Sequence, residues 1–225
     1  MNEDKNVLLY QNSKVNDKTY VEEISYKILN GEILIDYYKN KVRDDFYFKD
    51  HYGKYGKSFE NEKPLCRNWF NEGFPEELKE LGIAIDYESN IVLGVKTNID
   101  LVSYSKKGKC LCLIEVKGSL NNNVWKSDET LLRAILEIET YYLTLYKNSK
   151  IDKFKKTISS ALKDRMFDRN NIEKIKKYVV IPDNSIAAEM YKNPNVYPNL
   201  HNLIKLLNIN VLIFDEKYSM RNVGE

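Results

Sequence analysis

The sequence is poor in the residue types on which several common kinds of site depend. It has three cysteines, an odd number that argues against a disulfide framework, and these and its two histidines lack the spacing of a zinc site. Cys110 and Cys112 lie two residues apart, so a strand would place both on one face, where we expect small buried hydrophobic side chains. His51 and His201 have no serine or cysteine beside them in a catalytic setting, and we assign them no role.

Long hydrophobic runs and an excess of charge of one sign are also absent. No apolar segment approaches the roughly 18 residues that a membrane helix needs, and no long apolar stretch follows the polar N-terminus as in a signal peptide. We therefore expect a cytoplasmic protein without a membrane partner. The net charge is only +2 over 225 residues, so local rather than overall charge has to indicate any polyanionic partner.

The apolar segments that are present alternate between helix and strand patterns. The chain is long enough for one good core, and we expect an α/β fold in which residues 1–67 form a helical N-terminal extension packed on a domain of residues 68–225. Within the extension, apolar residues recur with helical spacing at 20–29 and again after Gly31. A loop rich in tyrosine, glycine and lysine is expected at 46–67.

In the domain, three closely spaced strands with tight turns predict an antiparallel meander between two helices. A basic helical stretch, two further strands and two further helices complete the chain, without an internal repeat. The predicted elements are a helix at 68–82, strands at 83–87, 91–105 and 110–117, helices at 128–147 and within 151–177, strands at 178–181 and 211–214, and helices at 185–192 and 199–207.

Charged residues interrupt the second and third strands, where a buried strand should be apolar. Asp100 lies in the second strand, and Glu115 and Lys117 flank Val116 at the end of the third. Alternation along a strand directs Glu115 and Lys117 to one face, and a meander can bring Asp100 beside Glu115. Two neighbouring carboxylates require a counter-charge, and a divalent cation with oxygen ligands supplies one. The alternative is a structural ion pair on a half-exposed sheet face.

The same three residues suit hydrolysis of a phosphodiester. A divalent cation lowers the pKa of a bound water, which becomes the nucleophile. Lys117, beside that water, can hold or deprotonate it and can stabilise the negative charge that develops on the phosphate. The sequence therefore predicts a metal-dependent phosphodiesterase site.

The spacing D-x(14)-E-V-K, from Asp100 to Lys117, resembles the signature of the PD-(D/E)XK nuclease superfamily. The helix before the three strands, the long helix after them and the further αβ elements are similar to the αβββαβ core of that superfamily. The resemblance is good over residues 98–141 and looser over 70–217. It implies a restriction-endonuclease-like fold, with a mixed central sheet flanked by helices.

The resemblance also implies a role for each residue of the motif. Asp100 and Glu115 would be metal ligands, with the backbone carbonyl of Val116 as a third. Lys117 would be the catalytic lysine. The implied cofactor is Mg²⁺, for which Mn²⁺ can substitute.

The rest of the family pattern is matched less strictly. Many exonuclease-like members carry Gln-x-x-x-Tyr on the following helix, and here Glu137 and Tyr141 have that spacing. Glu137 would join the catalytic set as an extra metal ligand, and the alternative is a pair on the helix surface. Ile99 replaces the proline that commonly precedes the aspartate. The family's acidic residue on the first helix is not fixed by spacing, and Glu72 and Glu76 are both candidates.

Basic residues near the motif are expected to hold the phosphate backbone of a nucleic acid. We predict a Mg²⁺-dependent DNA endonuclease of restriction or phage defence, and a homodimer if it cuts both strands. A catalytically silent nucleic-acid or protein-binding module, and a nuclease acting on RNA or branched DNA, are the alternatives.

For Arg133, a phosphate contact and a helical salt bridge to Glu129 or Glu137 are both open. The predicted substrate contacts are Lys96, Lys107, Lys126, Arg133 and Tyr141.

Overall fold

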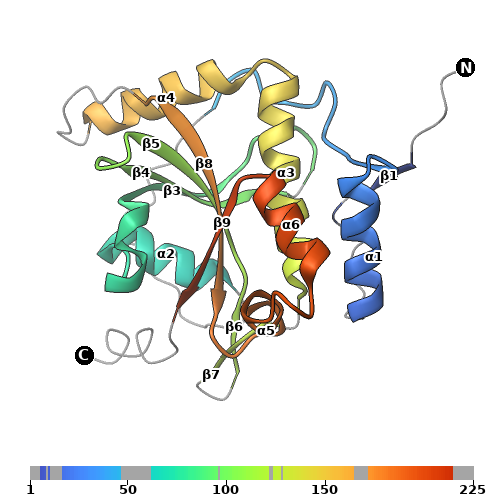
Figure 1. Ribbon diagram of the computed structural model, residues 1–225. Helices are drawn as coiled ribbons and strands as arrows, with labels where there is room; N and C mark the ends of the chain where they lie inside the picture. Colours follow the sequence, from blue (N-terminus) through green and yellow to red (C-terminus); the bar gives the residue numbers. More distant parts are fainter. Residues whose placement is uncertain are drawn as a thin grey trace, which may run out of the picture.

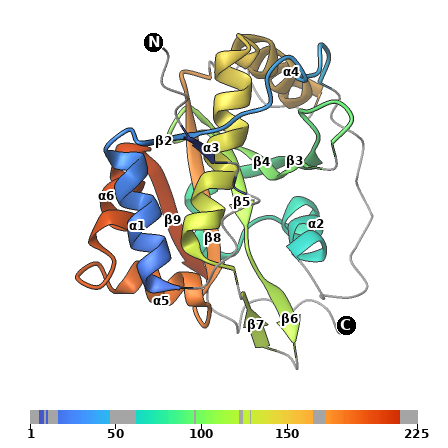
Figure 2. The same ribbon diagram turned by 90° about the vertical axis from the view of Figure 1, so that its right-hand side faces the viewer.

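A mixed five-stranded sheet lies at the centre of the protein, with helices on both of its faces (Figures 1 and 2). The computed structural model describes residues 6–8, 10, 17–46, 62–95, 97–121, 124–127, 129–164 and 172–214. The strand order is β3-β4-β5-β8-β9. The five strands are β3 (Ile83–Ser89), β4 (Ile99–Ser105), β5 (Cys110–Val116), β8 (Lys174–Pro182) and β9 (Ile209–Phe214).

The predicted meander is confirmed, because β4 pairs antiparallel with both β3 and β5. β5, β8 and β9 then run parallel to one another, and the connections between them carry helices, as parallel strands require. The prediction of a long strand at 91–105 is wrong. Asn90 instead bonds to the Val95 carbonyl and to Asn98, and Gly94 has a positive φ of 71° in the turn before β4.

Alternate residues of the central strands supply two separate hydrophobic cores. One core packs against α3 (Leu131–Lys147) and includes Leu111 and Leu113, whereas the other packs against α2 (Glu62–Glu72) and includes Cys112 and Ile114. The cysteines Cys66, Cys110 and Cys112 are free and buried, as predicted for the last two. Three helices that follow α3 in the chain lie on the same side: α4 (Ile151–Asp164), α5 (Ile186–Lys192) and α6 (Pro198–Leu206).

The region before the meander differs from the prediction in two places. The predicted helix at 68–82 is wrong, because α2 begins at Glu62 and ends at Glu72, and Gly73 then takes a φ of 93°. A separate 3-10 helix, η2 (Glu76–Leu81), follows extended Pro75. The boundary predicted between residues 67 and 68 therefore falls inside α2. The stretch after Gly31 is not helical, since β2 (Ile33–Ile35) pairs in parallel with β1 (Asn6–Leu8).

The N-terminal part of the chain packs on α3 and α6. In α1 (Lys18–Leu29), the Glu22 carboxylate accepts hydrogen bonds of 3.0 Å from the main-chain N–H groups of Asn199 and Leu200 at the start of α6. This contact places a negative charge at the positive end of the α6 dipole. The Thr140 hydroxyl of α3 donates to the Asp36 carbonyl just after β2. α1 and β2 are thereby attached to two helices of the domain.

The remaining elements were not all expected. A small hairpin, β6 (Ser119–Asn121) with β7 (Val124–Lys126), follows β5 and was not predicted. The predicted helices and strands from 128 onward are present with shifted ends, and α3 starts after the N-cap Thr130. None of the helices in the described part of the chain is long and apolar enough to span a membrane.

A buried ion pair fixes α3 against the sheet. The Lys177 side chain on β8 is 9% exposed and the Glu139 side chain on α3 is 6% exposed, and the two form a salt bridge. Lys177 also donates to the Leu207 carbonyl at 2.5 Å, and its ammonium lies 4.5 Å from the ring centroid of Tyr142. This pair orients the same helix that carries Glu137 and Tyr141.

We predict that Glu139→Leu lowers the free energy of unfolding by about 3 kcal/mol, because it leaves the buried Lys177 ammonium without its counter-charge. The double variant Glu139→Leu/Lys177→Met should recover most of this loss, since it removes both charges and keeps the side-chain volume. Urea unfolding of the two variants, with exposed Lys205→Met as a control, measures both effects. Equal losses in the single and double variants would contradict a role for the buried charge.

Candidate functional site

The motif residues meet at the end of the sheet where β5 finishes and β4 begins. Because the two strands are antiparallel, Asp100 at the start of β4 lies beside the end of β5. The Val116 N–H donates a 2.8 Å hydrogen bond to Asp100 Oδ2. Asp100, Glu115 and Lys117 all line one cavity of about 140 Å³. The antiparallel register of β4 and β5 thus places Asp100 beside Glu115, as the sequence predicted.

Lys117 is the central cation of this cavity. It follows β5 directly, and its side chain is 8% exposed. Its Nζ lies 2.7 Å from Glu115 Oε1, 2.8 Å from Glu137 Oε2 and 3.1 Å from Glu129 Oε2. Burial opposes its charge, but Glu115, Glu137 and Asp100 together hold the pKa of Lys117 well above its usual value. The lysine is therefore charged and fully compensated.

The carboxylates, in contrast, are not fully compensated. Burial, reinforced by Asp100 and Glu137, raises the pKa of Glu115 well above its usual value. Burial also raises the pKa of Asp100 to about 7 even though Lys117 and the Val116 N–H oppose the shift. Glu115 Oε2 is buried without a hydrogen-bond partner in the described residues. Five acidic residues and two lysines line the cavity: Glu62, Glu88, Asp100, Glu115 and Glu137, with Lys63 and Lys117.

The helix α3 closes one side of the cavity with the pair predicted from the sequence. The Tyr141 hydroxyl donates to Glu137 Oε1 at 3.1 Å, while Glu137 Oε2 accepts from Lys117. Tyr141 is 1% exposed, so the alternative of a pair on the helix surface is excluded. Tyr141 and Glu137, one turn apart on α3, therefore form a line of hydrogen bonds with Lys117 at the end of β5.

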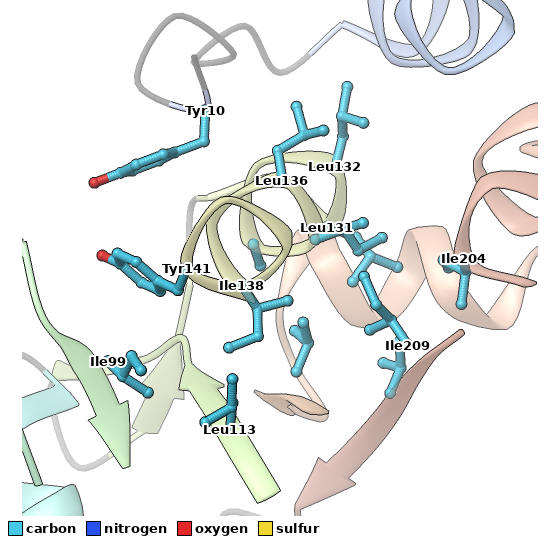
Figure 3. Packing of buried hydrophobic residues seen from close by; sticks show 14 of the residues in the cluster. Tyr10, Ile99, Leu113, Leu131, Leu132, Leu136, Ile138, Tyr141, Ile204 and Ile209 are labelled. Carbon is cyan, nitrogen blue, oxygen red and sulfur yellow. The ribbon is translucent and has the colours of Figure 1, made fainter. Parts of the chain in front are cut away.

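Tyr10 from the N-terminal segment covers this line of hydrogen bonds. Its ring centroid lies 6.2 Å from that of Tyr141, and Figure 3 shows both hydroxyls directed to the same side of α3. Burial, followed by the charges of Glu115 and Glu137, raises the pKa of Tyr141 well above its usual value, and a hydrogen bond with Tyr10 adds to the shift. The Arg133 guanidinium lies 5.8 Å from the Tyr10 ring centroid. Tyr10 and Tyr141, which are 131 positions apart in the sequence, thus form one wall of the cavity.

The predicted substrate contacts are only partly brought to the cavity. Tyr141 lines it, and Arg133 is held in a 3.2 Å ion pair with Glu129, which favours the salt bridge over the phosphate contact. Lys107 lies in the turn between β4 and β5, at the opposite end of both strands from Asp100 and Glu115. An antiparallel hairpin places its turn at that end by necessity. Lys96 and the side chain of Lys126 lie outside the described residues.

The acidic residue that the first helix contributes is Glu62, which the sequence reasoning missed. Glu62 lines the cavity and raises the pKa of Asp100 through its charge. The two candidates expected for this position lie elsewhere, since Glu72 is exposed at the end of α2 and Glu76 pairs with Lys79 in η2. Pro64, in the first turn of α2, was a signal for a helix start here. No sequence signal pointed to Tyr10.

The oxygen atoms at the cavity are of the kind that bind hard divalent cations. Among the described residues, however, no group of three or more histidine, cysteine, aspartate or glutamate side chains is arranged to hold a metal ion. Asp100 and Glu115 are therefore the side chains on which a metal site would have to rely. Both carboxylate oxygens of Glu137 are engaged, by Lys117 and Tyr141, whereas Lys117 engages only Oε1 of Glu115 and Oε2 has no hydrogen-bond partner in the described residues.

Comparison with known proteins gives no information on function, so the functional argument rests on the geometry of the cavity. No protein-family model matches the chain, and no curated protein or solved structure is significantly similar to it.

Tyr10 is 3% exposed, and we predict that Tyr10→Ala lowers the free energy of unfolding by about 3 kcal/mol through loss of its packing on Tyr141. Tyr10→Phe should cost about 1 kcal/mol, because it removes only the hydroxyl and its hydrogen bond. Urea unfolding is the measurement. Tyr26→Ala is the matched control, since Tyr26 is 52% exposed and should change the stability by less than about 0.5 kcal/mol. A Tyr10→Ala variant as stable as the control would contradict the packing of Tyr10 on Tyr141.

Proposed function

We propose that this protein is a divalent-metal-dependent DNA endonuclease of the PD-(D/E)XK type. The observation that carries the proposal is the convergence of Asp100, Glu115 and Lys117 on one cavity with Glu137 of α3 and Glu62 of α2. The order of elements supports it as well. A helix, a three-stranded meander, a second helix and a parallel strand follow one another, as in the αβββαβ core of that superfamily.

The cavity suits Mg²⁺, with Mn²⁺ as a substitute, because its charge is incompletely balanced. Its lining has three more acidic than basic residues, and Glu115 Oε2 is buried without a hydrogen bond. Asp100 and Glu115, with the Val116 carbonyl, would hold the cation as oxygen ligands. When bound, the cation would provide Lewis-acid activation of a water and of the scissile phosphate.

The chain's own residues would orient and stabilise the reacting groups. The Val116 N–H fixes the Asp100 carboxylate at 2.8 Å, so that the main chain of β5 determines its direction. Glu137 holds the Lys117 ammonium at 2.8 Å, and Tyr141 holds Glu137. Lys117 is thereby kept protonated at the cavity, which suits it to stabilise negative charge on a phosphate rather than to remove a proton.

We predict that Lys117→Ala lowers the rate of plasmid nicking in Mg²⁺ by at least about 100-fold, because the charge that would stabilise the phosphate is lost. Asp100→Asn should lower it at least as much, and EDTA should abolish nicking by the wild type. Supercoiled plasmid on agarose, with Mg²⁺ and with Mn²⁺, is the assay. Lys147→Ala is the matched control, since Lys147 is exposed at the far end of α3 and should leave the rate unchanged.

One observation favours a second function, that of a silent nucleic-acid or protein-binding module on a nuclease fold. Lys117 is already neutralised by three carboxylates, an arrangement that an ion-paired structural lysine would also have. A wild type that nicks no plasmid and cleaves no single-stranded DNA, RNA or branched DNA, with either cation, would contradict the nuclease and favour the silent module. Cleavage of RNA or branched DNA alone would instead change only the substrate.

A further inference from the structure

A basic groove lies at the end of the sheet opposite to the carboxylate cavity. The turn between β4 and β5 forms one side of the groove, η2 forms another, and the start of β8 closes it, with a volume of about 540 Å³. Figure 1 shows this turn at the end of β4 and β5 that is remote from the β6–β7 hairpin. Five residues of β4 separate Asp100 from the turn, which corresponds to roughly 17 Å. The groove is therefore a separate surface from the cavity.

The charge of the groove is strongly positive and largely uncompensated. Four lysines line it, Lys79, Lys106, Lys107 and Lys176, against the single carboxylate of Glu80. Lys79 has an ion-pair partner in Glu76, and neighbouring Lys109 has one in Glu173. Within the part of the chain that the structure describes, no carboxylate forms an ion pair with any of the other three lysines.

Two glycines, Gly82 and Gly108, are among the lining residues of the groove, and both lie where the chain packs closely on itself. Gly82 has a φ of 81°, and a Cβ there would lie 2.1 Å from the Tyr104 carbonyl oxygen, so only glycine allows η2 to end against β4. A Cβ at Gly108 would lie 2.9 Å from Cys110 Sγ. Both glycines therefore allow close packing within the protein, which holds η2 and the β4–β5 turn beside each other at the groove.

The lining indicates what kind of anion the groove accommodates. Lysines contact phosphates as point charges without reading base sequence. The one aromatic residue among the lining residues, Tyr178, is 2% exposed and interacts with Glu80, so it presents no face for base stacking. A groove with lysines and without an exposed aromatic ring suits the outer, phosphate side of a nucleic acid rather than its bases.

We propose that this groove binds the phosphate backbone of a nucleic acid, as a second contact surface remote from the carboxylate cavity. The proposal rests in part on the proposed nuclease function, which gives the protein a reason to hold nucleic acid. It gives Lys107 a phosphate contact at the groove, whereas the sequence predicted that contact near the cavity. Binding at the groove requires no metal and no cleavage, so it can be measured separately.

The test is the salt dependence of binding to a fluorescein-labelled DNA duplex, measured by anisotropy in EDTA with the full chain. Each lysine that contacts a phosphate contributes about −0.9 to the slope of log K, the logarithm of the association constant, against log salt concentration. The variant Lys106→Ala/Lys107→Ala/Lys176→Ala should therefore reduce the magnitude of that negative slope by about 3 and weaken binding at low salt by at least about 10-fold. The control Lys18→Ala/Lys192→Ala/Lys205→Ala removes the same charge from α1, α5 and α6 and should leave the slope unchanged.

Equal slopes in the two triple variants would overturn the proposal, and so would a wild type that does not bind the duplex at low salt. If the triple variant fails to fold by circular dichroism, Lys106→Ala/Lys107→Ala replaces it, because both side chains are exposed in a turn and the expected slope change is then about 2. A wild type that binds through the groove but cuts nothing in Mg²⁺ or Mn²⁺ would disprove the nuclease function alone. Cleavage with unaltered binding in the triple variant would disprove the groove alone.

Discussion

The Lys117 ammonium is the charge on which the arrangement of the cavity depends. It joins the end of β5 to α3, because Glu115 belongs to the strand, Glu137 to the helix and Glu129 to the segment before the helix. Without it, three carboxylates would face one another in a largely buried space, and breaking such a buried pair typically costs several kcal/mol. The ion pair between Glu139 and Lys177 holds the same helix to β8, so two buried lysines orient α3 on the sheet.

Charge in this protein is separated along the strands of the central sheet. Acidic residues exceed lysines by three in the cavity at one end, and lysines exceed acidic residues by three in the groove at the other. The overall charge of +2 conceals both. In the proposed nuclease, the acidic end would hold a divalent cation and the basic end would hold phosphates, so that each end would bind a ligand of opposite charge.

Much of the fold was predictable from the sequence because its signals are local. Period-two alternation and short turns identified the meander, and the apolar stripe of α3 identified the long helix after it. The same alternation placed Glu115 and Lys117 on one face, and the meander placed Asp100 beside them. The errors fell where local signals conflict. Gly73 and Pro75 lay within an apolar pattern that continued past them, and the pattern after Gly31 suited a strand as well as a helix.

The sequence by itself determined the strand order of the meander and the identity of the charged motif, since both follow from neighbours in the chain. Only the tertiary structure decided which distant residues complete the site. Tyr10 and Glu62 reach the cavity through the packing of β1 and α2, and no period along the chain encodes that packing. Lys107, close to Asp100 in the sequence, lies at the far end of the hairpin because antiparallel strands carry their turn away from their open end.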